Sequence, residues 1–258
     1  MAQLNSRQWQ IINRKRSRFF RKYSRAFAIA LGKQIERVEK NILIDFNTIV
    51  DRVPELVNTQ DLMKPYVDLY KEVGGFFALD TLKGLQKASE TEILSVYEQA
   101  LEVYGMTLAT ENLKQITSTS ISEAQRILRP IISEALDEGF GVEKTATNIK
   151  KRFGVEYGKN QRWRAKRIAQ TELISASNQG AFEAARSVDF PVVKQWLAGG
   201  PNVRDTHIIV SSTAPIPLDQ FFTVGKGFAM QPGDMINLEN HPEELVNCHC
   251  ALSTRPAK

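Results

Sequence analysis

Proline is distributed unevenly along this chain, and its distribution limits the fold more than any other feature. Seven of the ten prolines lie after residue 190: Pro191, Pro201, Pro215, Pro217, Pro232, Pro242 and Pro256. Proline removes a backbone donor and interrupts helix interiors. Before about residue 188, apolar residues recur every three or four positions, which is the period of an amphipathic helix. The sequence therefore predicts helix up to that point and a different architecture after it.

Short β-like runs occupy the proline-rich part, at residues 192–197, 207–210 and 221–224. Segments that contain Gly and Pro separate them, which is typical of short strands joined by loops. The predicted fold class is a mainly α N-terminal region followed by a small α+β C-terminal domain with short antiparallel strands and long loops. The run Ser118–Ser120 is a favourable helix N-cap zone, so we predict domains at residues 1–117 and 118–258.

Two interruptions are expected inside the helical part of the second predicted domain. Pro130 predicts a kink or a break in a helix over residues 121–137. Gly154 is expected to close the next helix, so that residues 163–187 form a separate one.

The N-terminal segment carries charge of one sign. Residues 1–35 contain no Asp or Glu, and the whole chain has a net charge of +5 with a pI near 9.1. The apolar spacing predicts one long helix over residues 6–46 with a basic face, in a basic arm that docks on DNA or on a partner protein. A solvated helix in a bundle is the alternative. The predicted contact residues are Arg14, Lys15, Arg16, Arg18, Arg21, Lys22 and Arg25.

Membrane and secretory classes are not favoured by the sequence. No window approaches the roughly eighteen apolar residues that a membrane span needs. The N-terminus lacks the compact apolar stretch and small-residue cleavage site of a secretion signal. We therefore expect a protein made and kept in the cytoplasm, or inside an assembly formed there. Two nearly adjacent cysteines, Cys248 and Cys250, are too few for a disulfide framework.

An ordered series of motifs runs through the second half of the chain. Its members are Ile168-Ala-Gln-Thr-Glu172 with Asn178, Lys194-Gln-Trp196, Arg204-Asp-Thr-His207, Phe221-Phe222 and Asn247-Cys-His-Cys250. This order resembles the phage Mu protein F-like family of minor head proteins, which act in head morphogenesis. The family typically has Arg where this chain has Gln170 and again where it has His249. An Asp that usually precedes the Arg-x-x-His motif is also missing here.

The resemblance implies a non-enzymatic, few-copy head protein of a tailed phage. It implies binding to the portal protein, to capsid or scaffold proteins of the procapsid, and to packaged double-stranded DNA, without a membrane partner. The implied location is inside the head near the portal, with the host cytoplasm as the site of assembly. The motif residues expected to be structural are Thr171, Glu172, Asn178, Trp196, Arg204, His207, Asn247, Cys248 and Cys250.

The cysteines and His207 allow two interpretations. Thiolate and imidazole are ligands suited to zinc, so His207, Cys248 and Cys250 are candidate metal ligands. Only two cysteines exist, and Cys-x-Cys is tighter than the usual zinc knuckle. We therefore favour a chain without a cofactor, in which the two cysteines flank a short final strand and point together into a core.

Glu172 also allows two interpretations. Its carboxylate is predicted to hydrogen-bond the segment 204–207 and so to join a helix to the small sheet. The alternative is a metal-dependent nuclease or hydrolase that uses Glu172 and His207 with Cys248 and Cys250. A general DNA-binding module is the other alternative. No nucleophile elbow or phosphate-binding loop accompanies these residues, so a non-enzymatic role is the prediction.

Overall fold

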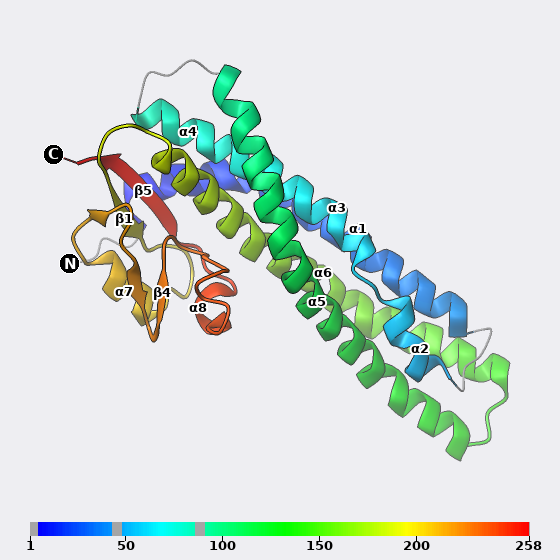
Figure 1. The fold of residues 1–258 in the computed structure, drawn as a ribbon. Coiled ribbons are helices and arrows are strands. Elements are labelled where there is room, and N and C mark those ends of the chain that lie inside the picture. Colours follow the sequence, from blue (N-terminus) through cyan, green and yellow to red (C-terminus); the bar gives the residue numbers. More distant parts are fainter. Residues whose placement is uncertain (1–4, 43–47, 86–90, 258) are drawn as a thin grey trace. The chain divides into compact units, whose positions relative to one another are not determined.

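The computed structural model describes residues 5–42, 48–85 and 91–257. As predicted, long helices precede a small C-terminal part with short antiparallel strands (Figure 1). The first elements are α1 (Arg7–Ile42), α2 (Ile49–Leu56), α3 (Gln60–Leu69), the π-helical turn η1 (Tyr70–Gly74), α4 (Gly75–Leu85), α5 (Thr91–Asp137) and α6 (Val142–Arg186). Then follow β1 (Val192–Leu197), α7 (Asp205–Ser211), β2 (Ile216–Pro217), β3 (Phe222–Val224), β4 (Gly227–Ala229), α8 (Pro242–Leu245) and β5 (Ala251–Pro256).

The predicted helix breaks do not occur. The helix α5 continues through residues 118–120 and through Pro130, and α6 continues through Gly154. The hydroxyls of Thr119 and Ser120 do not cap a helix, because they donate to carbonyls one turn earlier, at 2.9 Å in both cases. On either side of Pro130 the helix buries Ile127, Leu128, Ile131 and Ile132, and this packing outweighs the local cost of proline.

The chain divides into two compact units. The first unit contains Met1–Tyr23, Tyr66–Leu108 and Arg167–Lys258, and the second contains Ser24–Pro65 and Ala109–Lys166. The predicted domains at residues 1–117 and 118–258, as a division of function, stay a prediction. None of the helices in the described part of the chain combines the length and apolar character that crossing a membrane requires.

The second unit is held by one apolar core shared by four helices. Its buried members in α1 and α2 are Ile35, Val38, Ile49, Val53 and Leu56, together with Val57 directly after α2. The members in α5 are Ala124, Ile127, Leu128, Ile131 and Ile132, and those in α6 are Ala146, Ile149 and Phe153. Their spacing of three and four within each helix puts them on one face, as the periodicity predicted.

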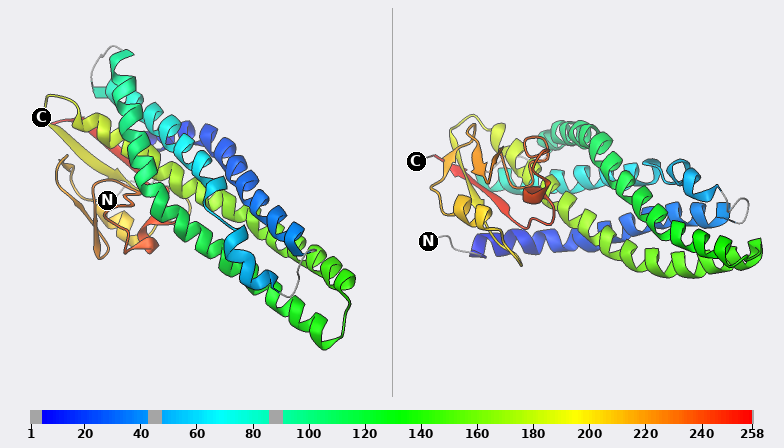
Figure 2. Two further views of the ribbon diagram at one scale, coloured as in Figure 1. Left: turned by 45° about the vertical axis from the view of Figure 1, so that its right-hand side comes forward. Right: turned by 90° about the horizontal axis from the view of Figure 1, so that it is seen from below.

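The first unit contains the strands, and β1 lies in the middle of its larger sheet. The order is β2-β1-β5, with antiparallel pairing that sets Trp196 opposite Leu252. Figures 1 and 2 show β1 beside the red C-terminal strand β5. The strands β3 and β4 form a separate hairpin, and α7 packs against β1 and β3.

Residues 207–210, predicted as a strand, belong to the helix α7. Arg204 is extended, with φ −70° and ψ 147°, and its carbonyl accepts from the backbone amides of His207 and Ile208, both at 3.0 Å. Asp205 in the first turn favours the helix because its negative charge faces the positive end of the helix dipole. These start signals outweigh the β propensity of the apolar run.

Candidate functional site

Asn178 of α6 lies at the centre of the motif residues. Its amide oxygen accepts from Arg16 Nη2 at 2.6 Å and from the backbone N–H of Leu252 at 2.9 Å. Its amide nitrogen donates to the carbonyls of Pro232 at 2.8 Å and of Cys250 at 3.3 Å. Asn178 is only 2% exposed. The buried side chain therefore joins α1, α6, β5 and the Pro232 loop through four hydrogen bonds.

Arg16 is buried, which corrects its assignment to DNA or partner contact. It is 2% exposed, and it also donates to Ser177 Oγ at 2.8 Å and to the carbonyl of Cys250 at 3.0 Å. Burial lowers its pKa to about 10, and the nearby thiols of Cys248 and Cys250 oppose that shift. Its position follows from helix phase, since Arg16 lies seven residues from both buried Trp9 and buried Tyr23. That spacing was the signal in the sequence.

The other six predicted contact residues differ in their surroundings. Lys15 forms an ion pair with Asp80, and Lys22 with Glu72. The Arg18 guanidinium lies 3.7 Å from the centroid of the Phe76 ring. The remaining three are exposed and form no ion pair with any described residue: Arg14, Arg21 and Arg25. Arg25 belongs to the second unit.

Glu172 faces a tyrosine cluster. Tyr70 of η1 donates to Glu172 Oε2 at 2.9 Å, and Tyr66 also hydrogen-bonds the carboxylate. Burial raises the pKa of Glu172 to about 7, and the two tyrosine hydrogen bonds oppose the shift. Within the described residues, no hydrogen bond joins Glu172 to segment 204–207, so the predicted contact is not formed. Thr171 instead connects α6 to the segment before the cysteines, because its hydroxyl accepts a hydrogen bond from the backbone N–H of Asn247 at 3.2 Å.

The Arg-x-x-His segment is held against the chain that precedes the cysteines. Arg204 donates to the carbonyl of Val246, and Thr206 donates to Glu244 Oε2 at 2.8 Å. Trp196 of β1 is 1% exposed, and its ring lies edge-on to that of His207, with 5.2 Å between the centroids. These contacts place His207 on the buried side of α7.

His207, Cys248 and Cys250 come together although 41 residues separate the histidine from the first cysteine. His207 Nδ1 lies 3.3 Å from Cys250 Sγ and 3.7 Å from Cys248 Sγ, and all three residues are buried. Both cysteines lie directly before β5, which begins at Ala251, and not on either side of it. Both thiols nevertheless point to His207 in the buried interior, as the interpretation without a cofactor expected. A turn directly precedes the cysteines, and Asn247 in it has a positive φ of 62°.

The two thiols differ in acidity. Hydrogen bonds from Cys248 and from His207 lower the pKa of Cys250 well below its usual range, although burial opposes this. The hydrogen bond with Cys250 and burial raise the pKa of Cys248. A backbone N–H also points at sulfur, from Cys250 to Cys248 Sγ at 3.4 Å. Glu244, which the sequence reasoning missed, lies beside the cluster, since its Oε2 is 3.0 Å from His207 Nε2.

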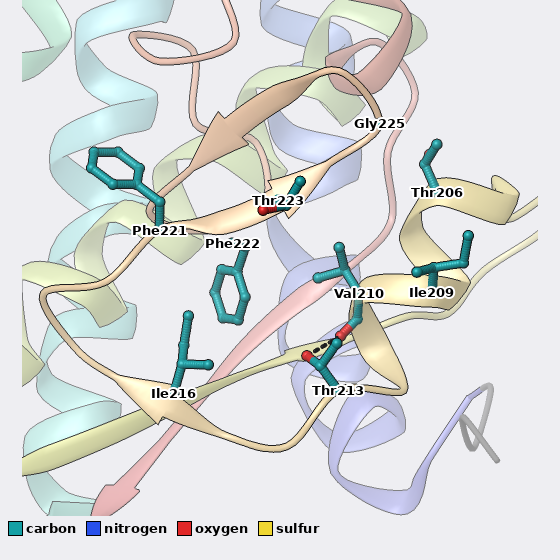
Figure 3. A pocket seen from close by; sticks show the side chains of 9 residues that line it. All are labelled: Thr206, Ile209, Val210, Thr213, Ile216, Phe221, Phe222, Thr223 and Gly225. Atoms are coloured by element: carbon teal, nitrogen blue, oxygen red, sulfur yellow. Dashed lines mark hydrogen bonds between the residues drawn. The ribbon is translucent and has the colours of Figure 1, made fainter.

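A groove opens beside this cluster, between α7 and the β3 hairpin (Figure 3). Ile209, Val210 and Ile216 line it together with Phe221 and Phe222. Ile209 is 64% exposed and Phe221 is 50% exposed. These two side chains leave apolar surface open to solvent at the groove.

The fold and the contacts define a mainly helical protein in which Asn178, His207 and the two cysteines are buried. Over 232 residues, 86% of its length, the chain is 23% identical to the minor head protein GP7 of Bacillus phage SPP1, and it covers 67% of that protein. No protein-family model matches the chain, and no solved structure matches it. This distant similarity supports the class of phage head proteins and is consistent with a non-enzymatic role. It does not single out the Mu protein F-like family.

Proposed function

We propose that this chain is a minor head protein of a tailed phage, of the Mu protein F-like kind, which binds the portal or procapsid during head morphogenesis and contacts packaged DNA. The similarity to a phage minor head protein carries this proposal. The order of the motifs from Thr171 to Cys250 supports it, because Thr171, Asn178, Trp196 and His207 each contact another element of the first unit. The site of action is the inside of the head near the portal, after assembly in the host cytoplasm.

The exposed arginines of α1 support contact with DNA. Arg7, Arg14, Arg18 and Arg21 are exposed on the part of α1 that belongs to the first unit. At about 100° per residue, their spacings of seven, four and three keep them within a narrow stripe on one helix face. Arg16 lies on the opposite face and is buried. A one-signed stripe attracts phosphates through counterion release, without reading base sequence.

The groove beside α7 is the proposed surface for the protein partner. Its exposed apolar side chains, Ile209 and Phe221, are large enough to act as anchors in a complementary surface. The basic stripe and this groove are separate features, so the two contacts are testable one at a time.

Co-expression with the portal protein of the same phage tests the protein contact. We expect the wild-type chain to co-purify with the portal and Ile209→Ser to be lost from the complex. Ile236→Ser is the matched control, since Ile236 is 52% exposed and does not line the groove. Absence of the wild-type chain from both portal and procapsid fractions at low salt contradicts the proposal.

Titration of duplex DNA at several salt concentrations tests the second contact. Each phosphate contact contributes roughly 0.9 to the slope of log affinity against log salt. The double variant Arg14→Gln, Arg21→Gln should therefore lower that slope by about 2. The variant Lys226→Gln, Arg255→Gln removes the same charge elsewhere and should leave the slope nearly unchanged. Equal effects of the two variants would show that only net charge matters, and the stripe would not be the contact.

A further inference from the structure

We propose that His207, Cys248 and Cys250 bind one zinc ion, which ties α7 to the turn before β5. The proposal goes beyond the assembly role and does not depend on it. These three residues form the one group of at least three potential metal-ligating side chains found in the described part of the chain.

The distances fit a shared ion. With Zn–S bonds of about 2.3 Å and Zn–N bonds of about 2.0–2.1 Å, ligand atoms at two tetrahedral corners lie about 3.5–3.8 Å apart. His207 Nδ1 lies 3.3 Å and 3.7 Å from the two sulfurs, and all three ligand atoms lie within 4.8 Å of one another. Only small side-chain shifts are needed to surround an ion.

The surroundings of the histidine are those of a metal ligand. A metal-bound imidazole usually directs its other ring nitrogen at a carboxylate, which fixes the tautomer and the ring orientation. His207 Nε2 lies 3.0 Å from Glu244 Oε2, although the two atoms are not aligned as a hydrogen bond. Glu244 is buried and is held in place by the hydroxyl of Thr206 at 2.8 Å.

The charges of the ligands balance that of the ion, because two thiolates neutralise a divalent cation. A neutral cluster avoids the large cost of leaving a charge unpaired in the protein interior.

The proposed role of the ion is to join α7 to the turn before β5, and its protein ligands are buried. His207, Cys248 and Cys250 are 1%, 2% and 1% exposed. Among the described residues, no fourth His, Cys, Asp or Glu belongs to the group, so three tetrahedral positions are filled by protein and the fourth is left for a small non-protein ligand. On binding, each thiol gives up its proton to solvent and no redox step occurs.

The test uses the full chain, purified without a polyhistidine tag from cells supplied with zinc. We expect stoichiometric zinc by elemental analysis and a lower melting temperature after chelation. Cobalt substitution should produce thiolate-to-cobalt charge-transfer absorption in the near ultraviolet. Cys248→Ser and Cys250→Ser should each lose this band, whereas His241→Ala should keep it, since His241 lies outside the cluster.

A further variant keeps the proposal testable if the cysteine variants fail to fold. Glu244→Gln retains the size of the side chain and an acceptor for Thr206, but it removes the carboxylate beside His207. We expect zinc affinity to fall about 10–100-fold in this variant. A wild-type chain that holds no zinc, gives no cobalt band and melts at the same temperature with zinc and with chelator would overturn the proposal. The cluster would then be a buried thiol–imidazole contact without a metal.

Discussion

Replacement of Asn178 by alanine removes the four hydrogen bonds that connect α6 to α1, β5 and the Pro232 loop. The wild-type side chain satisfies Arg16 Nη2, the Leu252 N–H and the Pro232 carbonyl, and it adds a second donor to the Cys250 carbonyl. Cys250 keeps its hydrogen bond from Arg16 Nη1. Three buried polar groups therefore lose a partner in Asn178→Ala, and one of them carries a charge.

The expected loss follows from the cost of each unsatisfied group, about 1–3 kcal/mol when buried. Three groups give about 3–6 kcal/mol if some water enters the space left by the amide. A domain of ordinary stability unfolds with only about 5–15 kcal/mol, so the variant should be close to unfolding at room temperature.

Urea unfolding followed by tryptophan fluorescence measures this loss in the first unit. Trp9 and Trp196 are buried there, whereas Trp163 lies in the second unit and is 58% exposed. A Trp163→Phe background therefore isolates the signal. Asn178→Asp keeps the oxygen that accepts from Arg16, but it replaces the nitrogen that donates to the Pro232 carbonyl with a second acceptor, so it should also be destabilised. The exposed Asn240→Ala should change stability by less than about 0.5 kcal/mol. A loss below about 1 kcal/mol in Asn178→Ala would refute the reasoning.

Three further perturbations have expected outcomes. In the folded chain Glu172 has a pKa of about 7, whereas in the unfolded chain it ionises near 4.5. The free energy of unfolding should therefore fall by about 3 kcal/mol as the pH rises through that interval. Urea titrations at several pH values measure this fall, and Glu172→Gln should remove most of it. Gly180→Ala should destabilise the first unit, because the added Cβ would lie 2.0 Å from the Gly74 carbonyl oxygen; an unchanged melting temperature would contradict this close approach. Trp9→Ala should cost about 3–5 kcal/mol in chemical unfolding, since the buried indole also donates to the His249 carbonyl at 2.8 Å.

Local pattern was sufficient for much of the fold. The change of period near residue 188 predicted the end of the long helices, and α6 ends at Arg186. The run 192–197 predicted β1 with the bounds that the structure has. These signals are short-range, because amphipathic period and glycine or proline placement act within a few residues. Predicted breaks at residues 118–120 and Pro130 failed because burial of the neighbouring apolar face outweighs local preference.

For the candidate site, the sequence indicated several of the residues but not their contacts. The motif order selected Thr171, Asn178, Trp196 and His207, and each of these side chains contacts another element of the first unit. The partners of these residues were not predictable, since hydrogen bonds such as that of Asn178 to Leu252 join positions 74 residues apart. No local period encodes such pairings, which form only when helices and strands pack.

The uneven placement of proline and the one-signed N-terminal helix are properties of the sequence alone, and they determined where helix ends and which segment is basic. Helix phase places Arg16 on the buried face of that basic segment, and only the tertiary structure decided that its partner there is Asn178. It also decided that Glu172 faces Tyr70 while His207 faces Glu244 and the two cysteines. The physical reason is the same in each case. A charged side chain that is removed from water needs a hydrogen-bonding or charged partner nearby. Which side chains are removed from water depends on how the helices and strands pack.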